Sequence, residues 1–138
     1  MAPTRKQNVA PIYLEPGHTV TCKAAAAITG SRFVKAAAGG LGNHPAVAPA
    51  TAGGAAYGVA HYDVPSGAQV SVIRQGTVGV VAGEALTSGD LVAVGADAKA
   101  VKPTAATTDG ETITAGSIVV GTCVADTASG AVAPITLA

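Results

Sequence analysis

The chain has 138 residues, a length typical of one domain, and its eight basic and eight acidic residues give a formal net charge of zero. Charged residues make up only 12% of the sequence. This balance excludes a strongly basic face, so we expect no nucleic acid among the partners, because nucleic-acid affinity depends on neutralising many phosphates.

Apolar residues are frequent but small. They account for 49% of the sequence, whereas aromatic residues account for only 3% and tryptophan is absent. A core of Val, Ala, Ile and Leu buries little area per side chain, and burial stabilises by about 25 cal/mol per Å². We therefore expect a thin core and a neutral surface, stabilised by contact with identical subunits or a larger partner.

The first 17 residues include Pro3, Pro11 and Pro16 among polar side chains. Because proline lacks the amide hydrogen that regular structure requires, residues 1–17 are predicted to form an extended N-terminal arm that contacts a neighbouring subunit. No apolar run reaches the length of a signal peptide or of a membrane span. We therefore expect synthesis and folding in a cytoplasm, with no membrane partner.

From Thr19 onward, short runs rich in β-branched residues alternate with clusters of Gly, Asp and Ser, which is typical of a small β-sandwich or β-barrel. The sequence predicts one all-β domain over residues 18–138. The runs 24–27 and 82–86 are long enough for one helical turn only. The predicted strands are 19–23, 32–36, 56–61, 69–73, 76–81, 90–94, 98–102, 117–125 and 132–137.

Two pairs of segments resemble each other. Residues 27–34 resemble residues 85–92, which lie 58 positions later, and residues 58–68 resemble residues 121–131, which lie 63 positions later. In a chain so rich in Gly and Ala, chance similarity is the alternative explanation.

If the resemblance is real, the domain consists of two similar halves, about 27–76 and 85–138. The five extra residues of the second half are then predicted to lie in a loop around 107–116. Each half is expected to contain a tight turn, at 63–67 and 126–130, because Asp and Ser side chains bond nearby amides and Gly accepts positive φ.

The residue types that commonly carry chemistry are few and widely spaced. His18, His44 and His61 form no HxxxH or HExxH pattern, and Cys22 and Cys123 form no CxxC pattern. A metal site or catalytic triad needs three such groups to converge. The cysteines lie in strand-like runs, so we expect reduced, buried thiols rather than a disulfide.

Other motifs also have structural explanations. The glycine-rich segments 39–42 and 53–54 do not complete a phosphate-binding loop, and the carboxylates mostly lie in turn contexts beside Gly or Ser. We therefore expect no catalytic residue, no metal site and no cofactor, and we predict that the protein is not an enzyme.

Several segments in order resemble a known family. Residues 13–17 lead into a strand, and they are followed by 27–34, 83–92 and 97–101. This series is similar to the capsid decoration, or head cement, proteins of tailed bacteriophages. The resemblance covers residues 12–138, and its motifs are informative as an ordered series rather than singly.

The resemblance implies a compact β-barrel or β-tulip-like module that sits on the outer capsid surface of the virion. It implies contact with the major capsid protein, often as a trimer, and a mechanical role in holding the shell together. Three alternatives stay open: another virion structural protein such as a tail-tube or head-closure subunit, a host-surface-binding β-module, and a small β-barrel enzyme.

Overall fold

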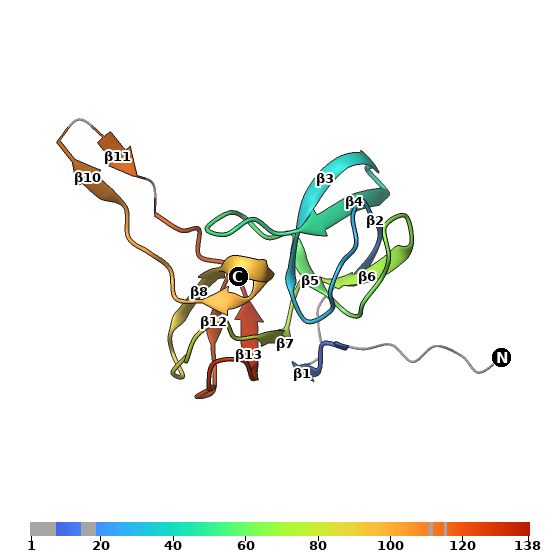
Figure 1. Ribbon diagram of the computed structural model, residues 1–138. Helices are drawn as coiled ribbons and strands as arrows, with labels where there is room; N and C mark the ends of the chain where they lie inside the picture. Colours follow the sequence, from blue (N-terminus) through green and yellow to red (C-terminus); the bar gives the residue numbers. More distant parts are fainter. Residues whose placement is uncertain (1–7, 15–18, 111, 115) are drawn as a thin grey trace.

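The computed structural model describes residues 8–14, 19–110, 112–114 and 116–138, and its regular structure is almost entirely β (Figure 1). In the described residues the one helical element is a short 3₁₀ turn, Ala96–Ala98. The predicted all-β class is therefore confirmed. The strands are β1 (Ile12–Leu14), β2 (Thr19–Ala24), β3 (Phe33–Leu41), β4 (His44–Pro49), β5 (Gly58–Ala60), β6 (Gln69–Ile73), β7 (Thr77–Val81), β8 (Leu91–Val94), β9 (Ala100–Val101), β10 (Thr107–Asp109), β11 (Thr112–Thr114), β12 (Gly121–Cys123) and β13 (Val132–Leu137).

The strands form a barrel and a second sheet that lie side by side. The barrel is closed by five strands in the order β2-β4-β3-β5-β6. The second sheet has six strands in the order β1-β7-β13-β12-β8-β9, all paired antiparallel. Figure 1 shows the barrel in blue to green and the second sheet in yellow-green to red apart from the blue β1, with the β10–β11 hairpin extending away from both.

Strand β4 was not predicted, because Pro45 and Pro49 cannot donate to a strand ladder. In the structure, β4 is sandwiched between β3 and β2. Its pairing with β2 involves only Ala46 and Val47, and the two prolines lie on either side of this pair. The missing donors therefore fall outside the doubly paired part of the strand.

The expected loop around 107–116 is a β-hairpin instead, in which β10 and β11 pair across Gly110 at φ +61°. The runs 24–27 and 82–86 form no helical turn. Main-chain hydrogen bonds place Ile28 and Leu86, at the ends of these runs, in β-bridges, which require an extended backbone. The predicted strand 117–125 is reduced to β12, since the residues before it connect the hairpin to the sheet.

The same aspartate turn occurs in the barrel and in the second sheet. The carboxylate of Asp63 accepts a hydrogen bond from the amide of Gly30 at 2.8 Å, and that of Asp126 accepts one from the amide of Ser88 at 2.9 Å. The donors lie 58 positions apart (30 to 88) and the acceptors 63 positions apart (63 to 126).

The main-chain bonds around these turns match as well. Ile28 and Val64 exchange two amide-to-carbonyl bonds of 2.9 and 3.0 Å, and Leu86 and Thr127 exchange two of 2.9 and 2.8 Å. We call two residues counterparts when they occupy matching places in these networks. Counterparts in the first part of each half lie 58 positions apart, and those in the later part lie 63 positions apart. The difference is the five extra residues of the second half.

The buried side chains form two clusters. The first fills the barrel: Cys22, Ala24, Ile28, Val34, Val47, Ala60, Val64, Val70 and Val72. The second lies under the second sheet and includes Val78, Val80, Val92, Cys123, Ala133 and Ile135. Three fully buried residues from the outside of the barrel, Phe33, Val59 and Ile73, complete this second cluster. Neighbouring strand residues point to opposite faces, so β3, β5 and β6 serve both cores.

Residues 8–14 lie along the chain's own barrel and second sheet. Ala10 is buried, and its amide donates to the carbonyl of His61 at 2.8 Å. The carbonyl of Pro11 accepts from the amide of Gly79 at 2.7 Å, beside the β1–β7 pairing. Gly79 must be glycine, because a Cβ there would lie 2.5 Å from the Pro11 ring. The rest of the predicted arm, residues 1–7 and 15–17, lies outside the described residues.

Candidate interaction surface

The residues considered for chemistry do not come together. His44 begins β4 and His61 follows β5, both half-buried, while Cys22 and Cys123 are free thiols in separate cores. His18 lies outside the described residues. Among the residues that the structure describes, no group of three His, Cys, Asp or Glu side chains is placed to hold a metal ion.

Four described carboxylates accept hydrogen bonds from backbone amides. Besides the Asp63 and Asp126 turns, Asp90 accepts from the amide of Thr87 at 2.9 Å, and Glu84 accepts from the amide of Lys102 at 2.9 Å. These bonds explain why acidic residues occur beside turns. In the described part of the chain, no helix is long and apolar enough to cross a membrane.

The Cys22 thiol is buried in the barrel core. Burial raises its pKa above the ordinary value of 9.0, and the positive charge of Arg74 acts weakly in the opposite direction. The folded chain therefore keeps this thiol protonated and unreactive where the unfolded chain would ionise.

We predict that a thiol reagent at pH 8 modifies Cys22 only after denaturation, as followed by absorbance and mass spectrometry. The free energy of unfolding should not depend on this group below pH 9, and should fall above it, because only the unfolded state then loses the proton. A Cys22→Val variant should lack that alkaline decline. Rapid modification of the folded wild-type protein would contradict the prediction.

One face of the second sheet is uncharged and open. The residues that alternate with the buried ones on β8, β12 and β13, or directly follow β12, point away from the core. We call them the outer face: Leu91, Thr122, Val124, Val132, Pro134 and Thr136. Three of them are large apolar side chains that remain substantially exposed: Leu91 at 52%, Val124 at 46% and Val132 at 40%.

The counterparts of part of this face are buried inside the molecule. Phe33 pairs with Val59, which pairs with Ile73, and all three have no exposed surface. Their counterparts are Leu91, Thr122 and Thr136, which form the same cross-strand row on the second sheet.

In the barrel, this row is covered by the second sheet. Two threonines replace the apolar residues at the uncovered end, as expected where a stacked unit ends. Leu91 keeps an apolar side chain without a partner in the described chain. The outer face cannot be recognised in the sequence. The strands that carry it alternate in the same way as the strands that carry the buried row of Phe33, Val59 and Ile73.

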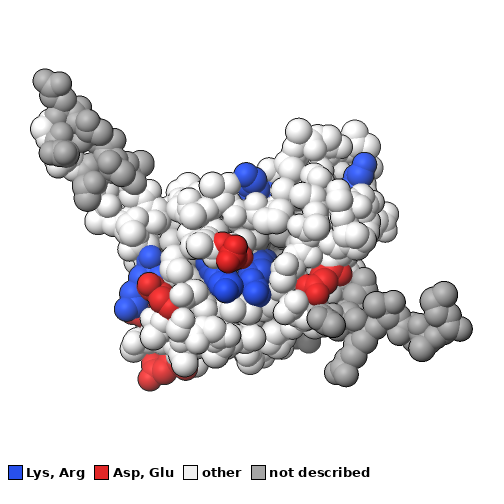
Figure 2. All heavy atoms as spheres, in the orientation of Figure 1, with Lys and Arg blue, Asp and Glu red and all other residues white. Residues whose placement is uncertain are grey.

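Charged side chains are sparse on the view in Figure 2, and most of that surface is neutral. Arg32 is half-buried and its guanidinium donates to the carbonyl of Ser31 at 3.3 Å. Burial lowers the pKa of Arg32, and the charges of Asp63 and Asp97 oppose this change. Arg32, a half-buried cation, thus has acidic neighbours, and contact through the surrounding surface requires the removal of few hydrated ions.

The closed barrel and the six-stranded sheet beside it define the chain as an all-β protein. A family model described as phage cement protein matches residues 14–137. The chain therefore belongs to the phage cement protein family, which makes it a structural protein of the phage head and confirms the resemblance found in the sequence.

The fold also resembles a solved structure, the N-terminal base of the head fibre protein gp8.5 of bacteriophage phi29. The two share 23% sequence identity at a TM-score of 0.65, and the similarity covers 88% of this chain and 93% of that one. This likeness supports the fold. No curated protein matches the chain.

Proposed function

We propose that the protein binds the outer surface of a phage head, contacts the major capsid protein and stabilises the shell. The observation that carries the proposal is the outer face, on which Leu91, Val124 and Val132 are exposed without a charged residue among them. Exposure of such an apolar face to water is unfavourable in free energy, and burial of the face against another protein removes this unfavourable contribution. The protein has no catalytic role, metal or cofactor in this proposal.

Shell geometry strengthens weak contacts. A closed shell repeats each interface many times, and subunits that hold several neighbours at once dissociate slowly even when a single contact is weak. We place the protein on the capsid as a trimer, with the arm of residues 1–17 held against its own chain at residues 8–14 and reaching the capsid or a neighbouring subunit from there. It is made in the host cytoplasm and binds neither nucleic acid nor membrane.

We further propose that the domain consists of two similar halves. Residues 18–138 form one β domain of two similar halves, about 27–76 and 85–138. The matching aspartate turns and exchanged main-chain bonds support this division. One half then supplies the buried row that completes the core of the other, and the second half leaves its own row free for the capsid.

Phage particles that lack the protein should assemble but release DNA at a lower temperature, or under chelator or osmotic stress. Addition of the purified protein should restore their resistance, because contacts across neighbouring capsid subunits oppose the internal pressure. A dye that fluoresces on released DNA, recorded during heating, measures the effect. Equal robustness without the protein, or cryo-EM density for it inside the shell or in the tail, would exclude the proposed role.

A further inference from the structure

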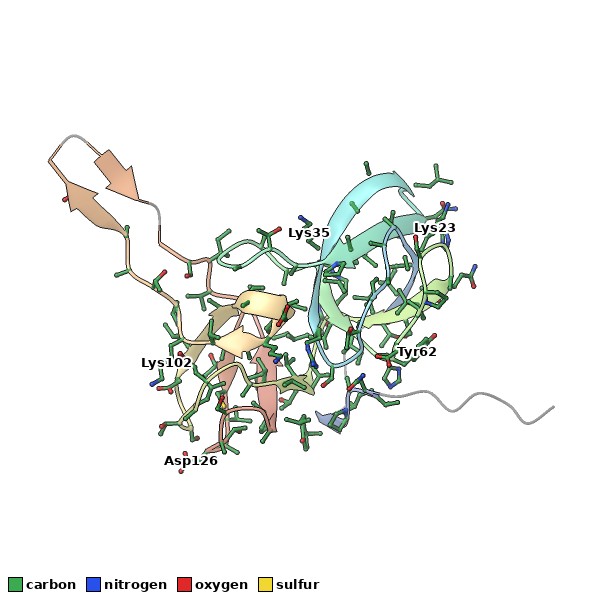
Figure 3. All side chains as sticks on the ribbon, viewed as in Figure 1. Lys23, Lys35, Tyr62, Lys102 and Asp126 are labelled. Carbon is green, nitrogen blue, oxygen red and sulfur yellow. The ribbon has the colours of Figure 1, made fainter. Side chains whose placement is uncertain are left out.

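A groove on the barrel carries positive charge. It has a volume of about 420 Å³ and lies between β3, the loop after β4 and the residue that follows β6. Its lining contains two cations and no carboxylate: Lys35, Ala36, Thr51, Gly54, Ala55, Ala56, Tyr57 and Arg74. Figure 3 shows Lys35 where the barrel faces the second sheet, well apart from Lys23 and Lys102.

Both cations are held in place. The guanidinium carbon of Arg74 lies 4.1 Å from the centre of the Tyr57 ring, and its Nε donates to the Tyr57 carbonyl at 3.0 Å. The ammonium of Lys35 donates to the hydroxyl of Thr51 at 2.7 Å. These contacts leave the terminal amino groups of Arg74 and further hydrogens of Lys35 available to an acceptor.

Among the described residues, no carboxylate lines the groove beside these two charges, whereas Arg32 has Asp63 and Asp97 nearby. Neither Lys35 nor Arg74 forms a hydrogen bond or ion pair with a carboxylate of the described residues. In a chain whose total charge is zero, this groove is therefore a local excess of positive charge.

The fold does not require these residue types. The amide of Tyr57 donates to the carbonyl of Val34 at 2.7 Å. In the second sheet the amide of Val120 donates to the carbonyl of Val92 at 2.8 Å, so Val120 is the counterpart of Tyr57. By the same correspondence, the counterparts of Lys35 and Arg74 are Ala93 and Leu137, which follow Val92 and Thr136. The counterpart cluster is apolar and largely buried. An aromatic residue with two cations is thus particular to the barrel.

We propose that this groove binds an acidic segment of the protein on which the module docks, with an Asp or Glu carboxylate between Lys35 and Arg74. The planar guanidinium presents two parallel donors that match a carboxylate, and the ring of Tyr57 fixes their orientation. The small residues Ala36 and Ala55 beside the cations leave room for a backbone to approach. A nucleic-acid ligand fits less well, since two cations neutralise few phosphates.

This inference rests on the proposed capsid binding, so the test uses particles that lack the protein. The wild-type chain and a Lys35→Gln, Arg74→Gln double variant are titrated onto them at several salt concentrations. We expect the double variant to bind about 10- to 100-fold more weakly at low salt, with a shallower dependence on salt. Arg74→Lys should lose part of the affinity, because it keeps the charge without the planar pair of donors.

Lys23→Gln is the matched control, since Lys23 is an exposed cation elsewhere on the barrel. It should bind like the wild type, and all variants should show the wild-type circular dichroism and Tm. If the wild-type chain fails to bind particles, the proposed function fails. If the wild-type chain and the double variant bind equally at every salt concentration, the groove inference alone is wrong.

A direct probe separates the possible ligands. Hexaglutamate should shift the NMR amide signals of Lys35, Tyr57 and Arg74 in the wild-type chain, and hexaglutamine should not. The double variant should lose the response to hexaglutamate. Absence of any shift, or tighter binding of inorganic phosphate or a single-stranded oligonucleotide than of hexaglutamate, would overturn the assignment to a protein carboxylate.

Discussion

Replacement of Phe33 by Ala should destabilise the folded chain by about 3–5 kcal/mol. Phe33 is the single phenylalanine of the sequence and has no exposed surface. Its side chain points outward from β3 of the barrel and packs in the core under the second sheet, where the other side chains are mostly valine and alanine. The small neighbouring side chains cannot move far enough to fill the cavity left by Phe33→Ala, so the free energy of unfolding should fall by most of the lost packing energy. Urea denaturation followed by circular dichroism measures the change.

The counterpart Leu91 provides the control. Leu91→Ala removes a large apolar side chain from the same place in the second sheet, but Leu91 is 52% exposed. The expected loss is about 1 kcal/mol or less, because little buried area disappears. If both variants lost similar amounts of stability, the burial contrast between the two rows would be wrong, and with it the idea that the outer face is free.

The largest functional effect is expected on the outer face. Val124→Asp combined with Val132→Asp should weaken binding to particles at least about 100-fold, because an unpaired carboxylate buried in an apolar contact costs several kcal/mol. Both side chains are substantially exposed in the isolated chain, so each change should lower the stability of the fold by only about 1 kcal/mol. Sedimentation of labelled protein with particles measures the binding.

Leu41→Asp tests whether any added charge has the same effect. Leu41 is 69% exposed at the end of β3, on the opposite side of the molecule from β12 and β13 (Figure 1). This variant should bind particles like the wild type. Loss of binding in Leu41→Asp, with binding retained in the double Asp variant, would place the apolar capsid contact on the barrel instead of on the outer face of the second sheet.

Sequence reasoning predicted much of the local structure. Strand positions followed from β-branched runs between turn residues, and most of them agree with the structure within a few residues. The strands that were missed depend on partners. The proline-containing β4 forms because strands flank it on both sides, and β1 forms because β7 offers an edge. A window of local sequence contains no information about such neighbours.

The candidate surfaces illustrate the same limit. Tyr57 and Arg74 lie 17 positions apart in the chain and meet only because β5 and β6 are adjacent in the barrel. Leu91 and Val132 belong to one face because β8, β12 and β13 pair in that order. Neither grouping has a sequence spacing that would reveal it.

Composition and turn chemistry are properties of short segments, so the sequence was sufficient for the all-β class, the neutral surface, the paired aspartate turns and the cement-family resemblance. It was not sufficient to separate Phe33 from Leu91. Both lie near the start of a strand after similar residues, and alternation shows only that one side of each strand is apolar. Tertiary packing decided which side is covered. The barrel closes on itself and presents the Phe33 row to the second sheet, which leaves the Leu91 row without a partner in the described chain.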